Sequence, residues 1–111
     1  MMPNTVSPAN DLRRYPRLLS PKGVLLAWQY GGKKLVSYLG NLGLGGLYIR
    51  TAEPPPPGTA IQLLLDAPAG EVRARALVQR SDPREGMGVK FIAMQREDRG
   101  RLAQWLRMLP A

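Results

Sequence analysis

One stretch decides the fold: GVLLAWQY at residues 23–30, then Gly31-Gly32, then KKLVSYLG at residues 33–40. The first segment is short and apolar and stops at two glycines, which suit the positive φ angles of a tight hairpin turn. The second segment alternates between two faces, one carrying Leu35, Ser37 and Leu39, the other carrying Lys34, Val36 and Tyr38. We therefore expect a β-hairpin whose second strand is half buried.

Four later segments also have strand character. Residues 47–51 and 59–66 are short and apolar, whereas residues 71–82 and 86–93 alternate. The expected inner faces carry Val72, Ala74, Ala76 and Val78 in one strand, and Met87, Val89 and Phe91 in the other. Between them, AEPPPPG at residues 52–58 is more typical of a stiff surface connection than of a proline-rich recognition site. Short strands separated by turn signals predict an antiparallel β-barrel.

A helix is expected at the C-terminal end, over residues 95–109. Its apolar stripe is formed at i, i+3, i+4 and i+7 by Leu102, Trp105, Leu106 and Leu109. Such a stripe packs most simply as a lid on the barrel. The alternative is a helix that docks a partner, because basic side chains surround the stripe: Arg96, Arg99, Arg101 and Arg107.

Composition limits the function. The 111 residues carry 16 Lys and Arg against 8 Asp and Glu, a net charge of +8, so we expect an anionic partner. The chain has neither cysteine nor histidine, which excludes disulfides, cysteine-based metal sites and the commonest general base. Its carboxylates are scattered, so we predict neither an enzyme nor a metal site. The sequence has neither a long apolar run nor an export signal, and we expect a cytoplasmic protein without a membrane span.

Three arginines gather in RRYPR at residues 13–17. A guanidinium binds a phosphate, or the O6/N7 edge of guanine, through two parallel hydrogen bonds. Pro16 favours an extended segment, so we interpret Arg13, Arg14 and Arg17 as a ligand clamp on an arm. The alternative is a solvated basic tail. We expect residues 1–12 to be a flexible tail and residues 13–111 to be a single domain.

A glycine-rich stretch, NLGLGG, occupies residues 41–46. Its three glycines indicate a backbone that needs positive φ or the close approach of another group, although a plain turn between strands is also compatible. It neither carries a lysine nor leads into a helix, as a phosphate-binding loop would.

Taken together, the two stretches resemble the signature of the PilZ domain family, RxxxR followed by [D/N]xSxxG. Here Arg13 and Arg17 form the first motif, and Asn41-x-Gly43-x-x-Gly46 follows 24 residues after Arg17. GMGVKF at residues 86–91 is similar to a late strand of the family, and the C-terminal helix agrees as well. The sequence departs from the pattern at Gly43, where the family usually has serine.

The resemblance implies a six-stranded antiparallel PilZ-type β-barrel with a C-terminal α-helix, and a bacterial receptor or adaptor for cyclic di-GMP. It assigns Arg13, Arg14 and Arg17 to the phosphates and guanines, Asn41 to a hydrogen bond with guanine, and Gly43 and Gly46 to a close backbone approach. It implies no cofactor besides this ligand. We expect the arginine arm to become ordered on binding and the signal to pass to a protein of motility, secretion or regulatory machinery. Without ligand, we expect a monomer.

Two other functions are compatible with the sequence. One is a PilZ-like adaptor that does not bind the nucleotide and acts through protein contacts. The other is a small basic β-barrel that binds single-stranded nucleic acid. Such barrels place several aromatic residues on one strand face, whereas here only Trp28 and Tyr30 have that spacing within a predicted strand.

Overall fold

The predicted hairpin forms as β2 (Leu25–Tyr30) and β3 (Lys33–Gly43) in the computed structural model, which describes residues 17–19 and 23–109. Both turn glycines have positive φ, 53° at Gly31 and 82° at Gly32, which matches the hairpin turn expected from the sequence. The predicted faces of β3 are also confirmed, because Leu39 is buried while Val36 and Tyr38 are exposed.

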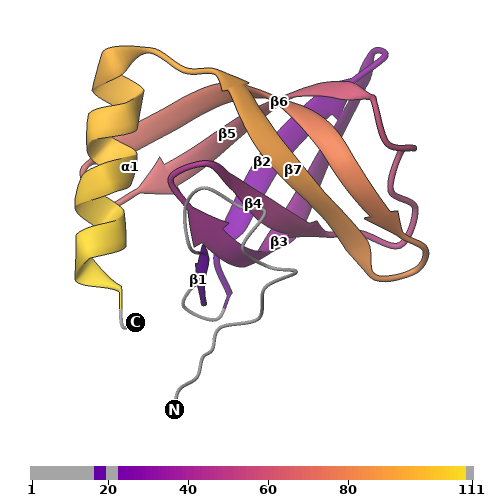
Figure 1. The fold of residues 1–111 in the computed structure, drawn as a ribbon, viewed down its shortest axis with the longest axis horizontal. Coiled ribbons are helices and arrows are strands. Elements are labelled where there is room, and N and C mark those ends of the chain that lie inside the picture. Colours follow the sequence, from indigo (N-terminus) through magenta and orange to yellow (C-terminus); the bar gives the residue numbers. More distant parts are fainter. Residues whose placement is uncertain (1–16, 20–22, 110–111) are drawn as a thin grey trace.

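Six antiparallel strands close into a barrel (Figure 1). The remaining strands of the ring are β4 (Gly46–Arg50), β5 (Ala60–Ala67), β6 (Gly70–Asp82) and β7 (Gly86–Ala93). Their order is β3-β2-β5-β6-β7-β4, and the ring closes because β4 pairs back onto β3. The predicted six-stranded barrel with one C-terminal helix is therefore confirmed.

A further short strand, β1 (Arg17–Leu19), lies outside this ring. It pairs with the last three residues of β3, beyond the part of β3 that pairs with β2. The sequence pattern predicts no strand here. The expected boundary between a tail and the domain, at residues 12 and 13, lies outside the described residues.

The barrel interior is filled by alternating side chains, as the sequence pattern predicts. The predicted inner face of β6 is confirmed, since its four residues are at most 7% exposed, and that of β7 is confirmed by Met87, Val89 and Phe91. The largest fully buried side chain is Trp28 of β2, whose Nε1 donates a hydrogen bond to Ser37 Oγ at 2.9 Å. Strand register is thus fixed by burial on one face of each strand.

The proline-rich segment connects β4 and β5, as predicted. Pro55 is buried and its carbonyl accepts a hydrogen bond from Ser81 Oγ, while the Gly58 amide donates to the Val78 carbonyl at 2.8 Å. These bonds hold the segment against β6, which agrees with a stiff connection.

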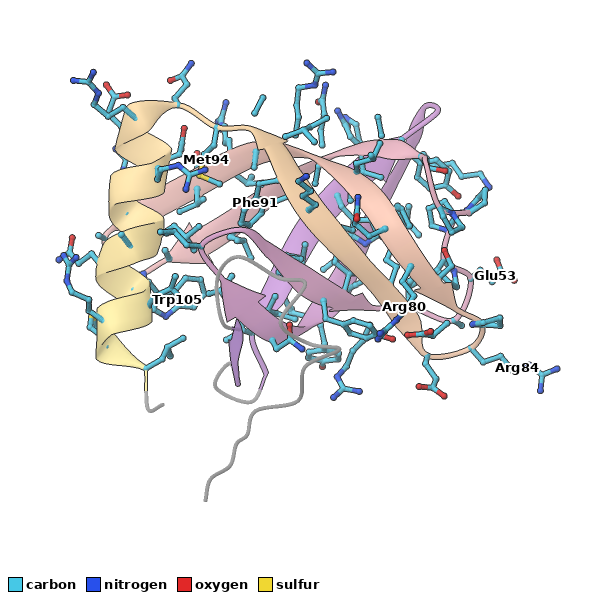
Figure 2. All side chains as sticks on the ribbon, viewed as in Figure 1. Glu53, Arg80, Arg84, Phe91, Met94 and Trp105 are labelled. Atoms are coloured by element: carbon cyan, nitrogen blue, oxygen red, sulfur yellow. The ribbon has the colours of Figure 1, made fainter. Side chains whose placement is uncertain are left out.

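Helix α1 (Arg96–Met108) covers one end of the barrel. Leu102 and Trp105 are buried, and Figure 2 shows Trp105 on the side of the helix that faces the strands. In the first turn, Asp98 accepts a hydrogen bond from the Arg73 backbone amide at 3.1 Å. In the next turn, Arg101 donates to the Glu71 carbonyl at 3.1 Å. The apolar stripe is therefore a lid on the barrel. Within the described residues, the only helix is too short and too polar to cross a membrane.

Two glycines provide a matched test of this packing. A Cβ at Gly86 would lie 2.2 Å from the Ile49 carbonyl oxygen, whereas a Cβ at Gly100 would meet nothing within 4 Å. We expect Gly86→Ala to lower the free energy of unfolding by about 1–3 kcal/mol, as overpacking does. Gly100→Ala should raise it by roughly 0.5–1 kcal/mol, because alanine favours the helix interior. Urea denaturation measures both, and equal effects of the two changes would contradict the packing described here.

Candidate functional site

The two motifs meet where β1 pairs with β3. In this antiparallel ladder the backbone of Arg17 lies opposite Gly43, and that of Leu19 lies opposite Asn41. The end of the arginine motif and the start of the Asn-x-Gly motif, 24 residues apart in the sequence, are therefore neighbours in space. Arg13 and Arg14 lie outside the described residues, and for Arg17 the structure describes the backbone.

A β-bulge in β3 determines which way Asn41 faces. Leu39 pairs with Ile49 and Asn41 pairs with Tyr48, so Gly40 is an extra residue on β3. Leu39 and Leu42 are both buried although they are three residues apart, which regular alternation does not allow. The bulge inverts the alternation, so Asn41 and Gly43 lie on the outer face of the barrel. Bulges commonly re-aim side chains beside functional sites.

The side-chain oxygen of Asn41 is the notable polar atom of this region. Asn41 Oδ1 is buried and has no hydrogen-bond partner among the described residues. An unpaired buried acceptor costs about 1–3 kcal/mol, so a donor is expected to reach it. A ligand that carries an N–H group would satisfy this atom.

The glycine-rich stretch differs from the prediction. β3 continues to Gly43 and β4 begins at Gly46, so the turn consists of Leu44 and Gly45 only. Among the described glycines, positive φ occurs at Gly23, Gly31, Gly32, Gly58 and Gly70, and at none of the three glycines of this stretch. The positive-φ alternative is therefore excluded, and two interpretations stay: the close approach of another group and a plain turn between strands. Both Gly43 and Gly46 are buried.

The turn itself is anchored to two other elements. The Phe91 amide of β7 donates to the Gly45 carbonyl at 2.9 Å, and Arg99 Nη1 of α1 donates to the Leu44 carbonyl at 3.4 Å. The first residue after the turn, Gly46, pairs with Lys90. The turn between the two motif strands is thus in contact with the helix.

A cluster that the sequence pattern does not predict lies next to Asn41 on the outer face. The Tyr48 ring covers Gly40 and Gly86, where a Cβ would lie 3.0 Å and 2.7 Å from ring atoms. Arg80 lies over this ring, 5.9 Å from its centroid, on the outside of the barrel away from α1 (Figure 2). Asp82 Oδ2 accepts hydrogen bonds from Tyr48 Oη at 2.8 Å and from Arg80 Nε at 3.1 Å. Tyr48 meets Arg80 and Asp82 only through the register of strands that are far apart in the sequence, so the spacing of these residues in the sequence gave no signal.

The same outer face carries cationic side chains. Arg50, Arg80 and Lys90 are exposed there, on three strands that are adjacent in the sheet. Arg80 forms an ion pair with Asp82 at 3.1 Å, whereas Arg50 and Lys90 have no ion pair within the described residues. These two cations favour an anion.

The aromatic pair Trp28 and Tyr30 is not an external stacking surface. The two rings are stacked with centroids 5.6 Å apart and an interplanar angle of 6°, but Trp28 is only 2% exposed. Bases of single-stranded nucleic acid stack on exposed aromatic rings. This observation weighs against the nucleic-acid alternative.

The chain matches the family model of the PilZ domain over residues 11–108 and therefore belongs to the PilZ domain family. PilZ domains are binding and adaptor domains rather than enzymes. Within the described residues, no group of three acidic side chains is arranged to hold a metal ion.

Solved structures with the same fold agree. The PilZ domain of Escherichia coli YcgR with c-di-GMP is 19% identical, with a TM-score of 0.69 over 87% of this chain and 90% of that one. The Bacillus subtilis inhibitor of motility (MotI/DgrA) is 20% identical, with a TM-score of 0.68 over 86% of this chain and 50% of that one. The K. pneumonia MrkH–c-di-GMP complex is 17% identical, with a TM-score of 0.68 over 86% and 51%. The chain thus spans about half the length of the last two proteins. Comparison with curated proteins gives no match.

The Tyr48 hydroxyl offers a test of the outer cluster. Burial raises the pKa of the Tyr48 phenol above its ordinary value, and the hydrogen bond to Asp82 raises the pKa further. Because the folded-state pKa is raised, the resulting stabilisation is complete below about pH 10 and is lost as the pH rises through the folded-state pKa.

We expect Tyr48→Phe to lower the free energy of unfolding at pH 7 by about 1 kcal/mol, the net value of one hydrogen bond. The difference between the two proteins should shrink above about pH 10. Urea denaturation across this pH range measures it. The matched control is Tyr38→Phe, since Tyr38 is 55% exposed and its loss should change little. A difference that grows with pH would contradict the role given to Tyr48.

Proposed function

We propose that this PilZ domain is a cyclic di-GMP receptor whose site is the junction of β1 and β3. Arg13, Arg14 and Arg17 would bind the phosphates and guanine edges, and Asn41 would hydrogen-bond a guanine. Gly43 and Gly46 would allow the backbone to come close to the ligand. The observation that carries the proposal is the β1–β3 register, which brings Arg17 beside the Asn-x-Gly motif.

The unpaired Asn41 oxygen supports a base that donates a hydrogen bond, because Asn41 Oδ1 needs a donor. Guanine has a donor at its N2 amino group, and adenine has one at its N6 amino group. The preference for guanine therefore rests on the arginines, which bind its O6/N7 edge through two hydrogen bonds. Several neighbours of the same fold, YcgR and MrkH among them, were solved in complex with c-di-GMP, which supports the same ligand here.

The proposal includes an adaptor role. The arginine arm would become ordered over the ligand and the change would pass to a protein partner. The turn at Leu44 provides a route, because its carbonyl is bonded to Arg99 of α1. A shift of β3 at Gly43 would therefore reach the helix directly.

We expect calorimetry to show binding of cyclic di-GMP with a clear preference over cyclic di-AMP. Each bidentate arginine–guanine pair that adenine cannot form costs about 1–3 kcal/mol. Arg17→Ala should weaken binding roughly ten- to a hundredfold, the value of a charge-assisted hydrogen bond. The control is Arg107→Ala on the exposed side of α1, which should bind as the unchanged protein does. Equal affinity for both dinucleotides would contradict the guanine contacts.

Limited proteolysis tests the ordering of the arm. Trypsin should cleave after Arg13 and Arg14 quickly in the free protein and slowly with saturating cyclic di-GMP, as read by mass spectrometry. Arg17 begins β1, so cleavage after it should be slow in both cases, which makes it an internal control. If Arg13 and Arg14 stay fully accessible at saturation, the arm does not close on the ligand.

A further inference from the structure

The outer face of β3, β2 and β5 carries an exposed apolar row. Ala27 of β2 pairs with Val36 of β3 on one side and with Leu64 of β5 on the other, so the three side chains are neighbours. Val36 is 67% exposed, and the next pair along the strands, Leu25 with Tyr38, is 48% and 55% exposed. Isolated apolar residues are ordinary on a surface, whereas a contiguous group marks an interaction site.

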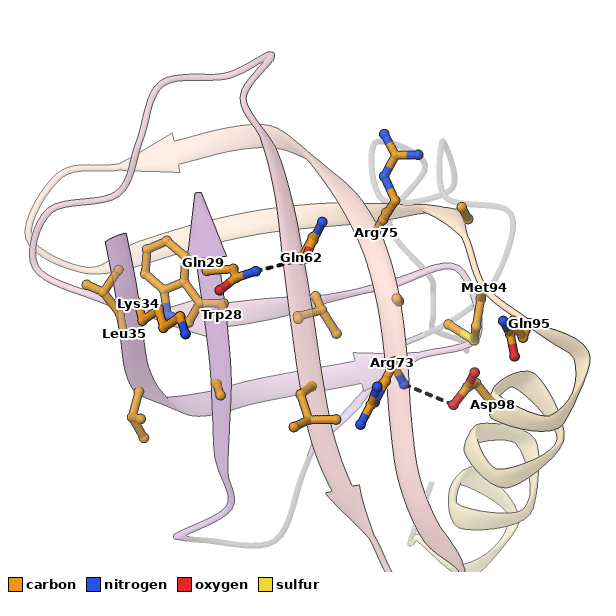
Figure 3. Close-up of a pocket in the computed structure, with 16 residues that line it drawn as sticks. Trp28, Gln29, Lys34, Leu35, Gln62, Arg73, Arg75, Met94, Gln95 and Asp98 are labelled. Atoms are coloured by element: carbon orange, nitrogen blue, oxygen red, sulfur yellow. Dashed lines mark hydrogen bonds between the residues drawn. The ribbon is translucent and has the colours of Figure 1, made fainter. Parts of the chain in front are cut away.

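This apolar row (Val36, Ala27 and Leu64) lies in a groove. A cavity of about 930 Å³ is lined by all three residues and extends to Met94 and Asp98, where β7 leads into α1 (Figure 3). The groove lies over β3, β2, β5 and β6, whereas the proposed dinucleotide site lies where β1 meets the other end of β3. It is therefore a second surface.

Two cations lie on one side of the row, and Asp66 and Glu71, whose backbones are opposite each other on β5 and β6, lie on its other side. The neighbouring row across the same strands is Lys34, Gln29, Gln62 and Arg75, in which Gln29 Nε2 donates to Gln62 Oε1 at 2.8 Å. Arg73, at the end of the apolar row, is paired with Glu71 at 3.1 Å, whereas Lys34 and Arg75 have no ion pair within the described part of the chain. Three strand spacings separate their backbones, about 14 Å.

The charges choose among the possible occupants. A second copy of the chain carries the same net charge of +8, which opposes association. A nucleic acid would match the charge, but Tyr38 is the one exposed ring beside the row among the described residues, whereas single-stranded nucleic acid stacks successive bases on several rings. An acidic polypeptide with apolar side chains matches the row and the lining of the groove, in which Lys34, Arg73 and Arg75 outnumber the carboxylate of Asp98.

We propose that this groove docks an acidic segment of a partner protein. Its apolar side chains pack on the Val36–Ala27–Leu64 row, and its carboxylates reach Lys34 and Arg75. The inference rests on the adaptor part of the proposed function and does not require dinucleotide binding.

A displayed library of random 16-residue peptides is the probe. Peptides selected on the full chain should be rich in Asp, Glu and large apolar residues. Their affinity should fall about tenfold or more with Val36→Asp, and likewise with Lys34→Glu combined with Arg75→Glu. The matched control is Arg96→Glu combined with Arg107→Glu, which changes the net charge equally on exposed positions of α1 and should leave affinity unchanged.

The outcomes separate the alternatives. The proposal is overturned if the library yields no peptide whose binding is weakened by Val36→Asp, or if it yields basic peptides. It is also overturned if a thymidine oligonucleotide binds the protein more tightly than the selected peptides do and the same variants weaken that binding. Val36→Asp should bind cyclic di-GMP as the unchanged protein does. If the unchanged protein binds the peptides but not cyclic di-GMP, only the proposed function is contradicted. If it binds cyclic di-GMP but none of the expected peptides, only this inference is contradicted.

Accessibility of the groove is tested separately. The chain has no cysteine, so Val36→Cys introduces a single thiol. It should react with a maleimide as fast as the exposed control Gln104→Cys, in a protein that light scattering shows to be monomeric. Slow reaction in a monomer would mean that another part of the chain covers the groove, and slow reaction in a dimer would mean that a second copy does. Either result overturns the proposal.

Discussion

The extra residue in β3 is the constraint on which the rest of the structure depends. β3 pairs with β2 and β1 along one edge and with β4 along the other, so it closes the ring. At Gly40 the bulge inverts the alternation of side chains. Before it, Leu35 and Leu39 face the core; after it, Leu42 does, and Asn41 is released to the outside. Without the bulge, a leucine would face water and an amide would enter the core.

The position of the bulge also explains the neighbouring glycines. The Tyr48 ring, opposite Asn41, lies flat across Gly40 and Gly86. A side chain at either position would lift the ring and separate Tyr48 from Asp82. The packing that closes β3, β4 and β7 and the polar surface beside the candidate site are thus built from the same residues. Barrel stability and site geometry are therefore coupled at this point.

Much of the fold was predictable because burial alternates regularly. β7 has the predicted bounds, α1 differs from the prediction by one residue at each end, and the inner faces of β6 and β7 are as expected. Regular alternation is also the reason for the failures. Alternation cannot locate a bulge. The strand that forms β3 was therefore predicted to end at Gly40, and the face on which Asn41 lies was not predicted. β1 is too short to produce a pattern, and the Tyr48–Arg80–Asp82 cluster depends on register between strands far apart in the sequence. The backbones of Arg17, Asn41, Gly43 and Gly46 are brought together, while the assignment of these residues, and of Arg13 and Arg14, to a ligand stays a prediction.

Because β1 lies outside the ring, its movement is independent of the pairings that keep the six-stranded barrel closed. Among the described strands, β1 pairs only with β3, while the six others complete the closure among themselves. Detaching β1 would therefore expose the end of one strand edge and leave the barrel closed. The pairing of β1 consists of three residue pairs, and its loss would break none of the pairings that hold the core together.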